Sequence, residues 1–106
     1  MKGSFAMSWS ISHGGTPRGT FSGTQIGELG DELKAKASWS QWRRVKAVFA
    51  CRSGDPFDLA PAQAGLAGAA LLAAAPRLSA DSAANARQIG DSALRAARAG
   101  ERWEWS

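Results

Sequence analysis

Residues 7–13 read Met7-Ser8-Trp9-Ser10-Ile11-Ser12-His13, and residues 102–106 read Arg102-Trp103-Glu104-Trp105-Ser106. Polar and apolar residues alternate one by one in both stretches, which is the pattern of a strand with one buried face. Because successive side chains of a strand point to opposite faces, Trp9 and Ile11 share one face, as do Trp103 and Trp105. Terminal segments stay ordered only when other structure holds them. We therefore expect both strands to belong to one sheet, with these four side chains facing the helices.

The segments between the two strands predict four helices and one further strand. Ser22 and Ser38 each precede a glutamine by three residues, the spacing of a capping box, and start helices that run to about Ala37 and about Cys51. Pro61 starts a third helix that ends near Pro76, and a fourth begins at Ser79 or Asp81 and ends at Gly100.

A short middle strand is expected at residues 57–59, and residues 13–19 are expected to form a loop because they are rich in Gly and Pro. The sequence thus predicts an α+β fold. Its sheet is small and three-stranded, made of both terminal strands and the middle strand, and packs against about four helices.

Helical periodicity predicts which faces are buried. In the second helix, Trp42 lies in the same apolar arc as Val45 and Phe49, so we expect Trp42 to be core and Trp42→Ala to cost about 3–5 kcal/mol. The third helix is small or apolar on its whole circumference and should be covered on most sides. Small residues in the third and fourth helices predict that their axes approach closely.

Length and composition limit the class of protein. With 106 residues and 44% hydrophobic content, residues 7–106 can form a single domain with a modest core, while residues 1–6 are expected to be a cloning remnant or an N-terminal extension. The formal net charge is +4, with acidic residues interspersed among the basic ones. The uncharged stretch 59–76 contains proline, glutamine and glycine, which argues against a membrane span. The single Cys51 cannot form an intramolecular disulfide, which favours a cytoplasmic location.

Catalytic chemistry has little support in the sequence. One His and one Cys do not make a zinc cluster, and His13 with Cys51 is more simply explained as a strand end and a helix end than as a base and a nucleophile. Asp55 and Asp58 fit a turn and a solvated strand better than acid–base catalysis. We expect no catalytic residue, cofactor or metal ligand, and an enzyme of unknown class is the least favoured reading.

Binding is the favoured function. Five tryptophans are many for a core of this size, and exposed aromatic residues beside arginine dominate contact energies at protein interfaces. The candidate binding residues are Trp39, Arg43, Arg44 and Lys46, and the favoured reading is protein–protein interaction or self-association. The alternative is a nucleic-acid-binding regulatory protein that uses the basic second helix, where Lys34, Lys36 and Arg52 add charge around Trp39 and Trp42.

The start Met7-Ser8-Trp9-Ser10-Ile11-Ser12-His13-Gly14, the segment Ser53-Gly54-Asp55-Pro56-Phe57 and the end Trp103-Glu104-Trp105-Ser106 resemble a family of small uncharacterised proteins of high-GC actinobacteria. The resemblance covers nearly the whole chain after Met7. It implies a free-standing cytoplasmic protein and assigns no functional residue.

Overall fold

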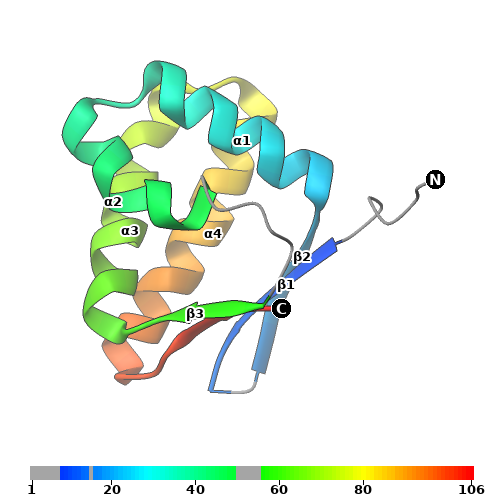
Figure 1. Ribbon diagram of the computed structural model, residues 1–106, viewed down its shortest axis with the longest axis vertical. Coiled ribbons are helices and arrows are strands. Elements are labelled where there is room, and N and C mark those ends of the chain that lie inside the picture. Colours follow the sequence, from blue (N-terminus) through cyan, green and yellow to red (C-terminus); the bar gives the residue numbers. More distant parts are fainter. Residues whose placement is uncertain (1–7, 15, 50–55) are drawn as a thin grey trace.

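The computed structural model of the chain describes residues 8–14, 16–49 and 56–106. The elements follow in the order β1 (Ser8–His13), β2 (Thr16–Ser22), α1 (Gly23–Lys36), α2 (Trp39–Phe49), β3 (Phe57–Leu59), α3 (Pro61–Ala74), the 3-10 turn η2 (Ala75–Arg77), α4 (Ala80–Ala99) and β4 (Trp103–Trp105) (Figure 1). The α+β class is therefore confirmed. The expectations for residues 1–6, Cys51, Arg52 and Asp55 lie outside the described residues.

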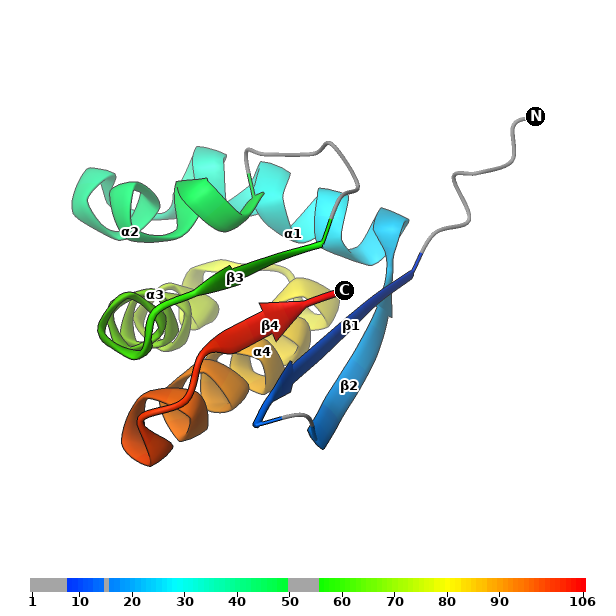
Figure 2. The same cartoon turned by 60° about the horizontal axis from the view of Figure 1, so that its bottom comes forward.

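The two terminal strands pair directly with each other. The sheet is antiparallel with the order β2-β1-β4-β3, and Ile11 lies opposite Trp105 while His13 lies opposite Trp103. Ser10 and Ser106 extend this pairing by exchanging two backbone hydrogen bonds of 2.7 and 2.9 Å. The expectation of one shared sheet is confirmed, and the helices lie on one side of it (Figure 2).

The sheet has four strands, so the expected number of three is wrong. The additional strand is β2, which begins inside the segment expected to be a loop and pairs with β1. Its register shifts beside Pro17, which lies opposite Ser12. A proline has no N–H to donate, and β2 tolerates it because an edge strand needs its hydrogen bonds on one side only.

The predicted starts of α1 and α2 and the predicted end of α4 are confirmed by their caps, whereas the predicted end of the second helix near Cys51 lies outside the described residues. Ser22 and Gln25 form both hydrogen bonds of a capping box (2.8 and 3.0 Å), and Ser38 and Gln41 do the same at the start of α2 (3.0 and 3.2 Å). Gly100 ends α4 with a φ of +68°, a conformation that glycine adopts without strain. These contacts are local in sequence, which is why the sequence predicts them.

The aromatic core joins the sheet to α2. Trp103 and Trp105 are fully buried, and the Trp105 ring stacks on Phe57 at 5.4 Å and meets the edges of Trp9 and Phe49 at 5.8 and 5.9 Å. Trp9 is half-buried on the same face. The four side chains at the two ends of the chain thus lie on the helix side of the sheet, as expected.

The expectation that Trp42 is a core residue is wrong. The buried residues of this helix are Val45, Val48 and Phe49, while Trp42 is half-buried and packs against the core from its edge. The position on the helix wheel does not account for this, because Val48 lies as far from Val45 (about 60° at 100° per residue) and is buried; the exposure of Trp42 is set by which neighbours cover the first turns of α2.

Helices α3 and α4 run side by side (Figure 1), and their backbones meet at two glycines. A Cβ on Gly68 would lie 2.9 Å from the carbonyl oxygen of Gly90, and a Cβ on Gly90 would lie 3.1 Å from the carbonyl oxygen of Gly68. The two backbones are therefore in contact, which confirms the close approach that the small residues predict.

Helix α1 is joined to α4 by one carboxylate. Glu32 accepts hydrogen bonds from the Ser79 amide (2.8 Å), the Ser79 hydroxyl (2.7 Å) and the Ser82 hydroxyl (2.8 Å). Ser79 is the N-cap of α4, so Glu32 supplies the acceptor that this helix start needs.

Candidate functional site

The four candidate binding residues are all exposed on α2, and two of them form a pair. Trp39 is 72% exposed, and the guanidinium carbon of Arg43 lies 4.7 Å from the centre of its ring. The residues are four apart on one helix, so they share a face. A cation over an aromatic face is attracted by the ring quadrupole, which holds this pair together at the start of α2.

Arg44 and Lys46 lie apart from each other. Two positions along a helix correspond to about 160° around its axis, so these side chains leave α2 on opposite flanks. Arg44 lines a groove between α2 and α3. Lys46 follows Trp42 by four residues, which places it about 40° from Trp42 and on the flank of α2 opposite to Arg44. The structure thus places the predicted residues on one helix but separates them into the Trp39–Arg43 pair, Arg44 and Lys46.

The groove beside Arg44 has a volume of about 290 Å³. Helix α2 contributes polar side chains to it and α3 contributes alanines; together they are Ser40, Gln41, Arg44, Ala69, Ala70 and Ala73. Its volume lies just below the range for ligand pockets, and its α3 wall is lined by the methyl groups of alanines. A wall of this kind can pack against an extended apolar surface of another molecule.

The groove opens onto a continuous apolar strip of α3. We define the α3 stripe as the exposed apolar residues Ala62, Leu66, Ala69 and Ala73, of which Leu66 is 50% exposed; the exposed Gln63 lies about 100° from Ala62 around the helix, outside the stripe. Ala67, Ala70 and Ala74 are buried on one side of it, and Gly68 packs against α4 on the other. The sequence could not single out this strip, because all faces of the helix are small or apolar.

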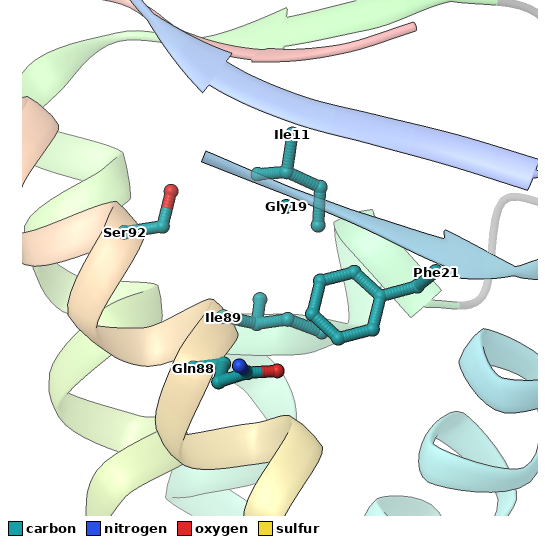
Figure 3. Close-up of a pocket in the computed structure, with 6 residues that line it drawn as sticks. All are labelled: Ile11, Gly19, Phe21, Gln88, Ile89 and Ser92. Atoms are coloured by element: carbon teal, nitrogen blue, oxygen red, sulfur yellow. The ribbon is translucent and has the colours of Figure 1, made fainter. Parts of the chain in front are cut away.

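A second hollow lies between α4 and the sheet. Figure 3 shows Phe21 and Ile89 beside it, with Ile11 and Gly19 from the strands and Gln88 and Ser92 from α4. Its volume is about 10 Å³, enough for about one water molecule and far below that of a ligand pocket. It is a small gap in the packing.

Two of the residues considered for catalysis, His13 and Asp58, make side-chain contacts that bridge distant parts of the chain. His13 Nδ1 lies 2.7 Å from Glu101 Oε1, and Asp58 receives two hydrogen bonds from the Arg102 guanidinium (2.9 and 3.0 Å). The bonds from Arg102 hold the pKa of Asp58 below its usual value, so this carboxyl is ionised and not a proton donor at neutral pH. In the described part of the chain, no three His, Cys, Asp or Glu residues gather to hold a metal ion.

The comparison with protein families places the chain in one of them. Residues 13–106 match the family model of a domain of unknown function, DUF7739. The chain belongs to the DUF7739 family. No curated protein and no solved structure matches it.

The DUF7739 match includes all of α2 and α3, and hence the α3 stripe and the groove. Among the described residues, no helix combines the length and apolar character needed to cross a membrane. The candidate site of this DUF7739 chain is therefore an exposed face made by α2 and α3, with apolar residues in its centre and polar residues at one edge.

Proposed function

We propose that this protein acts by binding another protein chain through the α3 stripe and the adjoining groove, and not by catalysis. The observation that carries the proposal is the composition of α3. Its fourteen residues include no charged one, although Leu66 is 50% exposed and Ala62, Ala69 and Ala73 also face the solvent. A solvent-facing helix normally carries charged and polar residues on its outer side. A contiguous apolar surface with a polar rim marks a contact site.

The neighbouring residues on α2 support the same proposal. Trp39 and Arg43 are residue types that contribute strongly to binding energy, and Trp39 exposes most of its surface. Cytoplasmic action belongs to the proposal as well, and the single Cys51 in the sequence supports it because the chain gains no stability from an internal disulfide.

Photo-crosslinking tests the proposal. Leu66 is replaced by p-benzoylphenylalanine, which an exposed position can accommodate, and the full chain is irradiated in the cells that produce it. We expect one discrete protein adduct, identified by mass spectrometry. The same photoreactive residue at Ala84, an exposed position of α4, serves as the control and should give no discrete adduct. Adducts of equal yield from both positions, or no protein adduct from Leu66, would refute the proposal.

Nucleic-acid binding is the second candidate, favoured by the exposed Trp39–Arg43 pair. An aromatic ring beside a guanidinium can stack on unpaired bases, and neither α2 nor α3 carries an acidic residue that would repel phosphates. This candidate predicts that affinity for single-stranded DNA or RNA falls steeply with salt and that Arg43→Ala/Arg44→Ala lowers the slope, because fewer counterions are released.

A further inference from the structure

Resting on the proposed function, we infer that the α3 stripe binds an amphipathic helix with acidic flanks that belongs to a different protein. Three arguments identify the chemistry of the partner. The spacing of the apolar residues indicates a helix, the basic charges beside the stripe indicate acidic flanks, and the same charges disfavour a symmetric dimer of this chain.

The spacing of the stripe indicates a helical partner. Ala62, Leu66, Ala69 and Ala73 follow one another at intervals of four, three and four residues. This is the alternation of apolar positions along a coiled-coil seam, where a second helix packs nearly parallel or antiparallel to the first. Alanine at three of the four positions allows the partner's axis to approach to about 8 Å. Helix α3 has fourteen residues and is about 21 Å long, so it can pack along about four turns of a partner helix.

The charges on both sides of the stripe select an acidic partner. On the α2 side, Arg44 lines the groove next to Ala69 and Ala73, and α2 has three basic residues and no acidic one. On the α4 side, Leu94 packs against α3 at Gly68. Arg98 follows Leu94 by four residues and Arg87 precedes it by seven, so both share the face of α4 on which Leu94 lies. Asp91 is the one acidic residue between them. A partner with Asp or Glu beside its apolar seam meets arginine on both sides.

Two-fold symmetry argues against a second copy of this chain. In a symmetric dimer each copy presents the same patch to the other. The α3 stripes would then meet with arginine-bearing rims on both copies, and like charges across an interface cost binding energy. A helix with acidic flanks has no such conflict.

A pair of synthetic peptides tests the inference. Both are fluorescent 21-residue helices with the same Leu and Ala seam, and one carries Glu at all flanking positions where the other carries Lys. In fluorescence anisotropy titrations of the full chain at physiological salt, we expect the Glu peptide to bind at least ten-fold more tightly than the Lys peptide.

Two pairs of variants locate the binding site. Arg44→Glu should weaken binding of the Glu peptide at least ten-fold, while Lys46→Glu, with the same change in net charge on the opposite flank of α2, should weaken it less than two-fold. Ala69→Glu should abolish binding because it blocks close approach at the centre of the stripe. Ala84→Glu on α4 is its matched control and should bind normally. All four positions are exposed, so the variants should fold.

Three results would overturn the inference. The first is equal affinity for the Glu and Lys peptides. The second is an equal loss of affinity for the Glu peptide in Arg44→Glu and Lys46→Glu, because this would indicate general electrostatic attraction and not a defined site. The third is a crosslink from Leu66 to a second copy of this chain with no binding of the Glu peptide. In that case the proposed function stands and the nature of the partner is wrong, whereas absence of any protein crosslink from Leu66 refutes both.

Discussion

Glu32 shows how one side chain can join two helices. Hydrogen bonds from the Ser79 hydroxyl and amide, and then from the Ser82 hydroxyl, favour the ionised carboxylate, and Lys36 adds a weaker attraction. Desolvation opposes them, yet the pKa of Glu32 falls from 4.5 to about 2. The negative charge also lies at the N-terminus of α4, where the helix dipole favours an anion.

The lowered pKa makes the link between α1 and α4 sensitive to acid. Because the ionised form is favoured in the folded state, its contribution to stability is complete above about pH 4.5 and is lost as the pH falls toward 2. The side chain is 23% exposed, so solvent screens part of the effect and we expect Glu32 to contribute about 2 kcal/mol.

Glu32→Gln should therefore lower the free energy of unfolding by about 2 kcal/mol at pH 7, measured by urea denaturation, and by much less at pH 2.5. The control is Glu28→Gln, an exposed position of the same helix. A loss of stability in Glu32→Gln that is the same at both pH values would show that the charge of Glu32 does not hold α4 to α1.

At the scale of elements, contact between α3 and α4 depends on two glycines that face each other. Alanine is the better helix former by about 1 kcal/mol, so an open glycine position would gain stability from the exchange. At Gly68 the added methyl would lie 2.9 Å from a backbone oxygen, which cannot move aside as the tip of a side chain can. The helices would have to separate.

We expect Gly68→Ala to destabilise the protein by about 1–3 kcal/mol, as overpacking of a core does. Gly65→Ala is the matched control in the same helix, because its methyl would meet only the methyl group of Ala97 at 3.3 Å. Its effect on the thermal unfolding midpoint should be small. If both variants unfold at the same temperature, the backbones of α3 and α4 are not in contact at Gly68.

Elements that depend on local contacts could be predicted from the sequence. The caps at Ser22, Ser38 and Gly100 involve residues within a few positions of one another, and the terminal strands show the alternation of a half-buried strand. Strand β2 could not be predicted, because its pairing partner β1 supplies the stability that Pro17 and Gly19 do not. The burial of Trp42 depends in the same way on which neighbours cover α2.

The candidate site was predictable in part for the same reason. Helical periodicity places Arg43 and Arg44 on the outer side of α2 and Lys46 at the edge of its apolar arc, and all three side chains are exposed in the structure. The groove beside Arg44 exists only because α3 lies against α2, and the exposed side of α3 is set by α2 and α4 together. No pattern within α3 itself distinguishes the α3 stripe from its buried faces.

In the whole molecule, the side chains that stabilise the fold and those of the proposed binding site lie in different places. The sheet and α1 bury their apolar side chains against the rest of the fold, and Trp103 and Trp105 bring the end of the chain into the core. The α3 stripe is the apolar strip that this packing leaves uncovered among the described residues. Its residues should therefore affect binding and not folding.

The most direct test of this claim is the crosslink yield from p-benzoylphenylalanine at position 66 in a chain that also carries Ala69→Glu, with Ala84→Glu as the matched background. We predict that Ala69→Glu lowers the yield of the discrete adduct at least ten-fold while its unfolding free energy stays within about 0.5 kcal/mol of the parent, as for other surface substitutions. The Ala84→Glu background should keep the full yield. An adduct that persists unchanged in the Ala69→Glu chain would contradict the assignment of the α3 stripe as the binding face.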